Sequence, residues 1–302
     1  MKLIGWGCTD TGRKRSHNED SYLVDAQSGL FAVADGMGGH RGGATASRMA
    51  MEIVRRCVVS AVDDLVSAAT RIQASPSLMA YADTGVMMRA DFDTARLLPD
   101  GVGNRPATSP SELALEPTVE FTSPPAVVVM RAAAEEASFD IFEAAAADEN
   151  LRGMGTTLTA MLYDDGRMYT IHAGDSRAYL YRNGVLEQLT EDHTWIAEQL
   201  KSGIMTEEEA KVSKYRHVIT RSIGFERTVE LDTFGLAVEA GDCFLLCSDG
   251  MSNHIEDDEI AQVMATTWYA KVPERLIQMA NDAGGDDNIT VVVAYVANQV
   301  GS

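Results

Sequence analysis

LFAVADGMGGHRGG, residues 30–43, joins a short apolar run to a cluster of glycines. The run at residues 30–34 has the length of a strand and is bounded by glycines, which predicts a buried strand. Asp35 follows it directly, so its carboxylate is aimed beyond the sheet, and the glycines let backbone carbonyls approach the same point. Carboxylate and carbonyl oxygens are the ligands of a hard cation, although Asp-Gly after a strand is also an ordinary hairpin turn.

The chain repeats this arrangement of an apolar run, an aspartate and a nearby glycine. Four aspartates lie at the end, join or start of such a run: Asp35, Asp175, Asp249 and Asp287. Glu19 and Asp20 form a fifth acidic group, beside the strand-like run 21–24. Carboxylates that are brought together repel one another strongly unless cations lie between them. Because oxygen ligands favour Mg²⁺ or Mn²⁺ over zinc or copper, the pattern predicts a site for these ions.

Hydrophobic periodicity predicts the regular elements around these aspartates. We expect one long amphipathic helix from Gly43 to about residue 73, and an alanine-rich helix at about 126–150. Strands are expected at 156–163, 167–173, 177–181, 185–189, 229–234, 242–247 and 289–296, and helices near 195–201, 206–211, 257–265 and 273–283. Asp165-Gly166 and Asn183-Gly184 are hairpin signals, so 156–189 is expected to form an antiparallel meander.

The distribution of proline marks an insertion. Seven of the eight prolines fall between residues 76 and 125, where regular structure is not expected to persist. We interpret residues from about 74 to 125 as an insertion within one domain, because the same motif pattern resumes after it. Residues from about 191 to 225 are polar and are expected to leave the sheet as a flap with short helices.

Composition excludes several classes of partner. The 302 residues carry a net charge of −20, which repels nucleic acid and anionic membranes. No apolar run approaches the roughly 20 residues that cross a bilayer. The four cysteines have no zinc-site spacing and are interpreted as reduced and structural, which indicates a cytoplasmic protein.

The expected ions suggest a chemistry. Two hard cations about 4 Å apart can share a water and lower its pKa toward neutrality, which supplies a hydroxide for in-line attack on phosphorus. Hydrolysis of a phosphate monoester also needs a cationic anchor for the phosphoryl oxygens, and Arg15 is the nearest candidate. The glycine-rich stretch lacks the Gly-Lys-Ser/Thr ending of a P-loop, which argues against a kinase or an ATPase.

Eight short motifs, in order, carry a resemblance to a known family. They are RSHNED (15–20), ADGMGG (34–39), GMGTT (153–157), GDSR (174–177), LTEDH (189–193), TRSIG (220–224), CSDG (247–250) and DNIT (287–290). With them the chain resembles a PPM-type (type 2C) metal-dependent protein serine/threonine phosphatase in its bacterial form. Eight ordered motifs are far more specific than any one of them.

The resemblance implies an α+β fold, a four-layer α-β-β-α sandwich of two antiparallel sheets flanked by helices. It implies a single phosphatase domain over residues 1–302, with its core at about 5–296. Two Mn²⁺ or Mg²⁺ ions, and a weaker third, would be held by seven residues: Asp35, Gly36 through its carbonyl, Asp249, Asp287, Asp20, Glu19 and, for the third ion, Asp175. Arg15 would bind the phosphate.

The general acid, the substrate and activity itself stay open at this point. Met37 stands where many eukaryotic relatives have a histidine that is a proposed general acid, and His40 is our candidate for that role here. The expected substrates are phosphorylated serine and threonine in proteins, with a cognate serine/threonine kinase as counterpart. The alternatives are a catalytically silent relative that binds or senses a partner, and an enzyme for a small phosphorylated metabolite.

Overall fold

The computed structural model describes residues 1–39, 41–74, 123–211, 213–215 and 217–298. In this part of the chain, strands form two five-stranded antiparallel sheets and a two-stranded ribbon. The first sheet has the order β1 (Lys2–Asp10), β12 (Ile289–Ala297), β11 (Cys243–Cys247), β8 (Arg177–Arg182) and β9 (Val185–Gln188). The second has the order β10 (Asp232–Ala237), β7 (Arg167–Ala173), β6 (Leu158–Asp164), β3 (Leu30–Ala34) and β2 (Ser21–Asp25). The ribbon pairs β4 (Gly36–Met37) with β5 (Gly155–Thr156).

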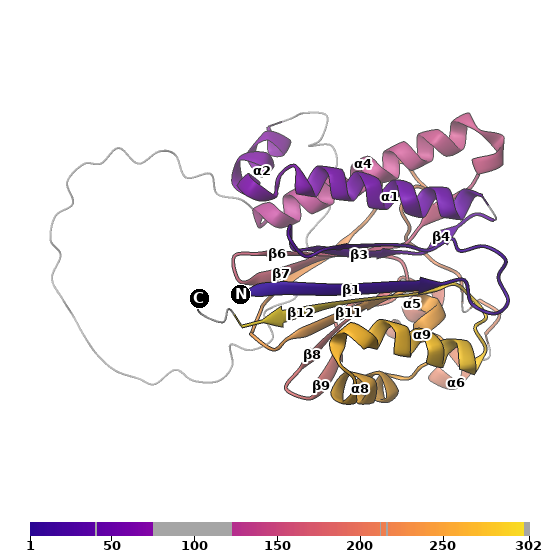
Figure 1. Ribbon diagram of the computed structural model, residues 1–302. Helices are drawn as coiled ribbons and strands as arrows, with labels where there is room; N and C mark the ends of the chain where they lie inside the picture. The colour runs from indigo at the N-terminus through magenta and orange to yellow at the C-terminus, as the bar shows by residue number, and fades with distance from the viewer. Residues whose placement is uncertain (40, 75–122, 212, 216, 299–302) are drawn as a thin grey trace, which may run out of the picture.

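Helices cover the outer face of each sheet, so the layers are helix, sheet, sheet and helix (Figure 1). The second sheet is covered by α1 (Gly42–Val59), α2 (Leu65–Gln73) and α4 (Pro125–Ala147), and the first by α8 (Asp257–Thr266) and α9 (Val272–Ala283). The shorter elements are η1 (Val62–Asp64), η2 (Glu149–Leu151), α5 (Trp195–Lys201), α6 (Glu207–Lys211), α7 (Asp249–Ser252) and η3 (Tyr269–Lys271). The α+β four-layer sandwich is therefore confirmed.

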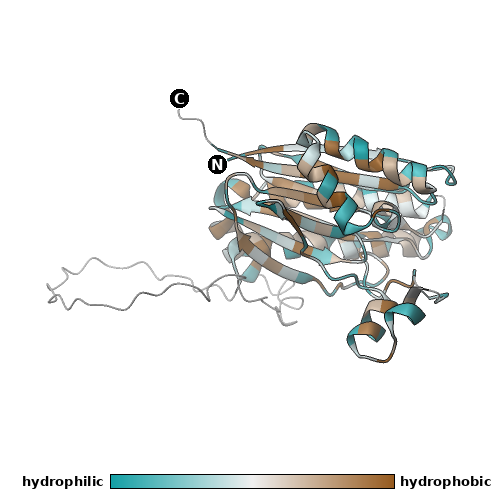
Figure 2. Cartoon of the chain, turned by 90° about the horizontal axis from the view of Figure 1, so that it is seen from below, coloured by the Kyte–Doolittle hydropathy of each residue, from teal (hydrophilic) through white to brown (hydrophobic). Residues whose placement is uncertain are grey.

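Alternation along the central strands builds the interior layers. In β11, Cys243, Leu245 and Cys247 join the cluster beneath α8 and α9, whereas Phe244 and Leu246 join the cluster between the two sheets. Successive side chains of a strand point to opposite faces, so a strand covered on both sides is apolar throughout. Figure 2 shows this distribution, with hydrophobic strands inside and helices that present hydrophilic residues outward.

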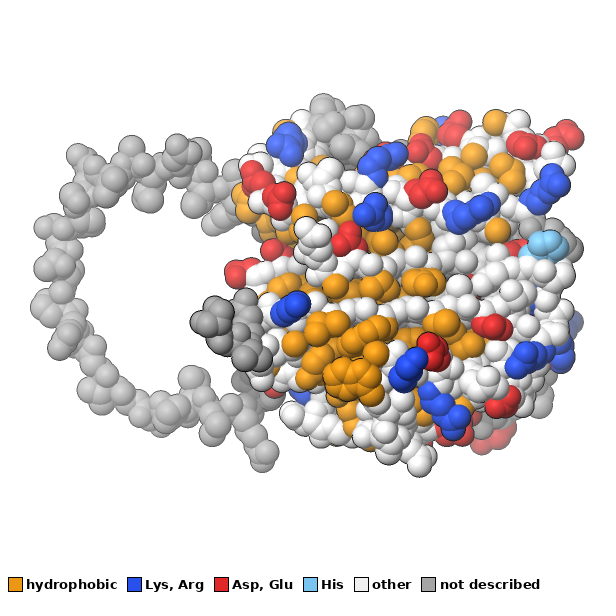
Figure 3. All heavy atoms as spheres, viewed as in Figure 1, with side chains coloured by type: hydrophobic (Ala, Val, Ile, Leu, Met, Phe, Trp, Pro, Cys, Tyr) orange, Lys and Arg blue, Asp and Glu red, His pale blue; other side chains and the backbone are white. Residues whose placement is uncertain are grey.

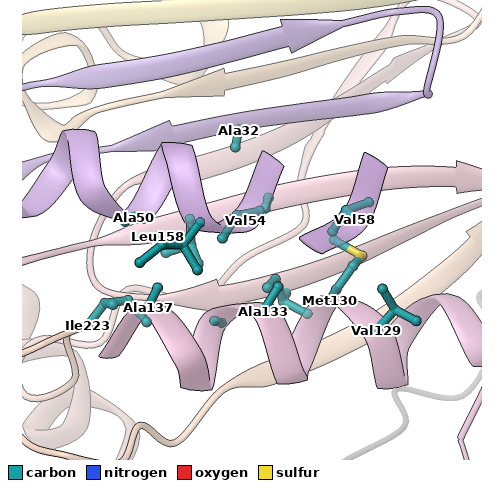
Figure 4. Packing of buried hydrophobic residues seen from close by; sticks show 14 of the residues in the cluster. Ala32, Ala50, Val54, Val58, Val129, Met130, Ala133, Ala137, Leu158 and Ile223 are labelled. Carbon is teal, nitrogen blue, oxygen red and sulfur yellow. The ribbon is translucent and has the colours of Figure 1, made fainter. Parts of the chain in front are cut away.

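Small residues let the helices α1 and α4 pack closely over the second sheet. Ala50 and Val54 of α1 lie near Ala133 and Ala137 of α4, with Leu158 of β6 in the same cluster (Figure 4). All five side chains are buried. The core on this side is thus filled by many short side chains rather than by a few large ones.

One long helix over residues 43–73 was the wrong prediction. The helical segment ends at Val59 and a new helix begins at Leu65, separated by η1. Asp64 caps the second helix, because its carboxylate accepts a hydrogen bond of 3.1 Å from the N–H of Ser67. The apolar spacing continues across the break, which is why periodicity alone did not reveal it.

The expected meander over residues 156–189 is also corrected. The hairpins form at the predicted turns, but β6–β7 lies in one sheet and β8–β9 in the other. The chain crosses between the sheets at Gly174–Ser176 and so carries Asp175 to the edge between them. β1 was not predicted at all, and its Gly5 and Gly7 lie so close over β2 and β3 that a Cβ at Gly7 would be 2.5 Å from Tyr22.

Charged side chains of both signs are interspersed on the face seen in Figure 3, where hydrophobic side chains gather along β1. The Trp6 and Trp268 rings meet edge to face there, with centroids 6.2 Å apart. Across the described residues, the helices are too short or too polar to cross a membrane. Most of the expected insertion, residues 75–122, lies outside the described residues.

Candidate metal centre

The predicted acidic residues, Asp20 excepted, line one cavity. The strand ends that carry them lie at one end of the sandwich, on the right in Figure 1, where β4 lies and β1 ends. Asp35 follows β3 of one sheet, whereas Asp249 follows β11 and Asp287 precedes β12 of the other. Asp175 lies at the crossing from β7 to β8. Because all four positions are strand ends at the same edge, the two sheets together surround one site.

These residues surround a cavity of about 660 Å³. Its acidic wall consists of Glu19, Asp35, Asp175, Asp249 and Asp287, and Gly36 lies among them. Lys14 and Arg15 also line the cavity, together with Ser16 and His17, all of them exposed to solvent. The structure therefore brings together the carboxylates that were predicted from separate stretches of sequence, with a basic rim beside them.

Asp20 is buried and does not line this cavity, but its carboxylate interacts with the charges of Asp249 and Asp287. Its Oδ2 accepts hydrogen bonds from the hydroxyls of Ser248, at 2.8 Å, and Thr290, at 2.6 Å. Burial raises the pKa of Asp20 to about 7, and the charges of Asp249 and Asp287 act in the same direction. Ser248 and Thr290 were quoted within motifs but were given no role from the sequence, since their partner is remote in the chain.

Several carboxylate oxygens of the site are buried without any hydrogen-bond donor. Within the described residues these are Asp20 Oδ1, Asp175 Oδ1 and Asp249 Oδ1. Burial, and then the charge of Asp249, raises the pKa of Asp175 to about 7. The pKa of Asp35 is also raised well above its usual range, by burial and by the surrounding aspartates. A desolvated cluster of like charges with unused oxygens matches what a hard cation requires.

Glycines hold two further oxygens against this cluster. A Cβ placed on Gly43 would overlap with Glu19 Oε2 and would lie 2.7 Å from the carbonyl oxygen of Gly36. A Cβ placed on Gly36 would similarly overlap with the carbonyl of Gly43. The carboxylate of Glu19 and the carbonyl of Gly36 therefore approach the same place only because these positions have no side chain.

The oxygens fit cations that keep part of their water shell. Among the described residues, no three carboxylate, imidazole or thiol groups converge closely enough to enclose a metal ion by themselves. Mg²⁺ is commonly bound through one or two carboxylates, with water in the remaining positions. The donor set at this edge, with carboxylates and one carbonyl but no sulfur, is of that type.

Arg15 lies at the cavity but is paired with one of the predicted metal ligands. Its Nη2 donates a hydrogen bond of 2.6 Å to Asp287 Oδ2, and the two side chains are 52% and 33% exposed. The other oxygen of Asp287 accepts the N–H of Asn288 at 2.8 Å. A half-exposed guanidinium at the rim can contact both this carboxylate and an incoming anion.

Asn288 is a residue of the site that sequence reasoning missed. Its Oδ1 accepts the N–H of Glu19 at 2.8 Å, and its Nδ2 donates to the carbonyls of Thr11 and His17, both at 2.9 Å. It thereby fixes the loop that carries the basic rim and Glu19 onto the start of β12. The DNIT motif contained it, but no local pattern indicated which loop it would hold.

Two histidines bear on the site. His40, the candidate general acid, lies outside the described residues. His217, for which the sequence indicates a structural or surface role, is exposed and lines the cavity. Burial raises the pKa of Asp249, and the interaction with His217 acts in the opposite direction. Nothing in its spacing indicated this position, because the flap brings it back over the site.

Comparisons with known proteins agree with this geometry. A family model described as protein phosphatase 2C matches residues 9–284. The serine/threonine phosphatase stp of Listeria monocytogenes is 31% identical over 94% of this chain and 92% of its own length. The crystal structure of the serine/threonine phosphatase PstP/Ppp of Mycobacterium tuberculosis is 30% identical, covers 99% of this chain and 100% of that chain, and superposes with a TM-score of 0.70.

A further structure shows ions in a relative. The catalytic domain of the serine/threonine phosphatase PstP, in complex with two manganese ions, is 30% identical and has a TM-score of 0.69, covering 98% of this chain and 99% of that chain. The fold agrees with these solved structures. The chain belongs to the protein phosphatase 2C family.

Proposed function

We propose that the acidic cavity is the active site at which this chain removes phosphate from phosphoserine and phosphothreonine in proteins. The observation that carries the proposal is the meeting of five carboxylates from both sheets beside Arg15, around one cavity. The relatives named above are serine/threonine phosphatases, and they match nearly the full length of the chain. Metal-dependent dephosphorylation is thus the supported reading, whereas a silent binding relative has no observation in its favour.

We assign a proposed role to each residue from the atoms that it can offer to a cation or to a phosphate. Asp35, Asp249 and Asp287, with the carbonyl of Gly36, would hold two cations, and Glu19 and Asp20 would act through water. Asp175 is proposed as ligand for a weaker third ion. When bound, such cations would lower the pKa of a water molecule, so that a hydroxide is available to attack phosphorus, and they would also neutralise the charge of the phosphoryl group. Arg15 is proposed to bind the phosphate, because its guanidinium stands at the rim with donors for two oxygens.

The shape of the cavity favours a protein substrate. One wall consists of the exposed residues 14–17, so the site opens to solvent along this side. A phosphorylated side chain on a protein loop can enter such an opening while the rest of the loop stays outside. A small metabolite would be expected to use a cavity closed on all sides.

Five finer points are also proposals. The metal is proposed to be Mn²⁺ or Mg²⁺, as two ions with a weaker third, and PstP with two manganese ions supports the count. A serine/threonine kinase with the same substrates is the proposed counterpart. A cytoplasmic location is proposed from the four free cysteines. We also propose one domain over residues 1–302, with the insertion at about 74–125 and the flap at about 191–225. Without a described residue at His40, its role as general acid stays a proposal.

The experiment is hydrolysis of a phosphothreonine peptide with Mn²⁺, with Mg²⁺ and with EDTA, for wild type, Asp249→Asn and the control Asp258→Asn. Asp258 is an exposed aspartate at the start of α8, so its amide should leave activity unchanged. We expect metal-dependent turnover that Asp249→Asn reduces by about 100-fold or more. Folded, metal-loaded wild type without turnover would contradict the proposal and restore the binding alternative.

A further inference from the structure

A buried pair of histidines lies behind the Asp175 turn and takes no part in the chemistry proposed above. The rings of His172 and His193 have centroids 4.7 Å apart and are tilted by 32°. Both side chains are buried, and both come from the segments that flank the flap and the sheet crossing. Each ring nitrogen has a partner, which allows the tautomers to be assigned from the hydrogen bonds.

His172 is a fixed neutral ring. Its Nε2 faces the carbonyl of Glu191 at 3.0 Å, and because a carbonyl only accepts, this nitrogen carries the hydrogen. Its Nδ1 is then the acceptor for the hydroxyl of Thr159 at 2.9 Å. Burial lowers the pKa of His172 to about 3, with His193 adding to the effect, so the ring stays uncharged. It forms one wall of the space that His193 occupies.

His193 holds Gly174 from both sides of its backbone. The N–H of Gly174 donates to His193 Nδ1 at 3.2 Å, and the backbone N–H of His193 donates to the carbonyl of Gly174 at 2.7 Å. Since Nδ1 accepts, the hydrogen of the neutral ring is on Nε2, which lies 3.2 Å from Asp232 Oδ2. The ring therefore connects Gly174, the residue before Asp175, to Asp232 at the start of β10.

The other side of the turn is held by the neighbour of His193. Arg177 donates from Nε and Nη2 to the two oxygens of Asp192, at 2.9 and 2.7 Å. Asp192 and His193 thus hydrogen-bond to the two ends of the turn 174–177, which contains Asp175. Gly174 has a φ of +117°, and a Cβ there would lie 2.5 Å from Thr157, so this backbone geometry is available only to glycine.

Both ends of the flap meet at the same residue. The carbonyl of His193 accepts the N–H of Thr220 at 2.9 Å, and next to it the N–H of Trp195 donates to the carbonyl of Val218 at 2.8 Å. Arg221, which follows directly, donates to Asp232 Oδ1 at 2.8 Å. The carboxylate of Asp232 therefore anchors both the His193 ring and the returning end of the flap.

We propose that His193 is a positioning residue that couples the base of the flap to the direction of the Asp175 carboxylate. The carbonyl of His193 contacts Thr220, and its ring lies between Arg221 Nη1, 3.3 Å from Nε2, and the N–H of Gly174. A displacement of Thr220 or Arg221 is therefore passed through His193 to the peptide of Gly174. A phosphopeptide that moves the flap would in this way change how Asp175 faces the cavity. The inference rests on the proposed function in one respect, namely that Asp175 is a ligand of a metal ion.

The test uses variants that separate the two ring nitrogens in the full chain. An asparagine amide oxygen stands where Nδ1 of histidine stands, so His193→Asn keeps an acceptor for Gly174 and loses the link to Asp232. A glutamine amide reaches the position of Nε2, so His193→Gln keeps a group near Asp232 and leaves the buried N–H of Gly174 without an acceptor. Asp232→Ala removes only the link on the flap side.

Three measurements are made on each variant. Hydrogen exchange without metal reports the amide of Gly174 and the flap, titration with Mn²⁺ reports binding, and turnover of a phosphothreonine peptide reports kcat and KM. We expect His193→Gln to exchange Gly174 faster and to lose about tenfold or more in affinity for the most weakly bound Mn²⁺ and in kcat. His193→Asn should stay within about threefold of wild type in kcat. Asp232→Ala should loosen the flap and, through the displaced His193 ring, should also speed the exchange of Gly174, by less than His193→Gln does.

Other outcomes overturn the coupling. A merely structural role for His193 predicts equal losses in the Asn and Gln variants, in step with their thermal unfolding temperatures and with no change in Mn²⁺ binding. Wild-type protection of Gly174 in His193→Gln would equally contradict the assigned acceptor. If wild type fails to hydrolyse the peptide, the proposed function fails, and hydrogen exchange and Mn²⁺ binding still decide the role of His193.

Discussion

Replacing Gly43 by alanine should reduce catalytic activity strongly while the protein stays folded. Gly43 lies in the first turn of α1, where alanine is ordinarily favoured over glycine by about 0.4–1 kcal/mol. Here the added Cβ would overlap with Glu19 Oε2 and would approach the carbonyl oxygen of Gly36 to 2.7 Å. Ordinary van der Waals contact begins at 3.4 Å, so the carboxylate has to move by about 1 Å.

The expected result is a folded enzyme with an impaired site. A misplacement of about 1 Å at a catalytic centre can cost about 100-fold in rate, and we expect a loss of this order in kcat/KM with Mn²⁺. The thermal unfolding temperature without metal should fall only modestly, because the helix propensity of alanine offsets part of the cost of shifting the backbone carbonyl of Gly36. Turnover of a phosphothreonine peptide, titration with Mn²⁺ and thermal unfolding are the three assays.

Gly42→Ala is the matched control. It makes the same change one residue earlier in the same helix, but its Cβ would meet Met154 Cβ at 3.0 Å and would touch no carboxylate. We expect this variant to keep activity within about threefold of wild type, since the group that its Cβ would displace is apolar and is not one of the proposed metal ligands. Wild-type turnover and Mn²⁺ affinity in Gly43→Ala, or an equal loss in both variants, would refute the reasoning.

Three further outcomes follow from the geometry. Burial raises the pKa of Asp20 to about 7, so the folded protein binds the proton of this carboxyl group more tightly than the unfolded chain does. In EDTA, the contribution of Asp20 to the free energy of unfolding should therefore fall as the pH rises from about 4 to about 7. Denaturation at each pH measures this fall, and saturating Mn²⁺ should remove it. Asp242→Ala should lower the free energy of unfolding, measured by urea denaturation, by about 3 kcal/mol, because it removes the buried partner of Arg182. Glu239→Ala removes an exposed partner of the same arginine and should lower it by less than about 0.5 kcal/mol. Arg15→Lys keeps the charge but loses the planar pair of donors, so KM for the phosphopeptide should rise about tenfold in steady-state assays while Mn²⁺ binding persists.

Local chemistry determined the turns and most strands. Asp165 and Asn183, each followed by glycine, adopt positive φ values of 42° and 53°, as hairpins at these dipeptides require. The positions of α9 and β12 likewise follow from periodicity within a short window. The break between α1 and α2 was missed because its cause is a cap at Asp64 inside a continuous apolar pattern.

The sheet to which each hairpin belongs could not be read in the same way. The hairpins β6–β7 and β8–β9 have similar patterns, yet they join different sheets. The choice depends on which faces are covered by helices and by the other sheet, and these neighbours are remote in the chain. The position of Asp175 between the sheets is a consequence of that choice.

The sequence by itself determined which groups are available: the carboxylates at strand ends, the glycines beside them and the arginine upstream. Only the tertiary structure decided their partners, such as Arg15 with Asp287, Asp20 with Thr290 and Gly174 with His193. The physical reason is the distance along the chain. A strand end or a turn is set by its neighbours in sequence, whereas the Asp20–Thr290 hydrogen bond joins residues 270 positions apart and forms only when both sheets are packed.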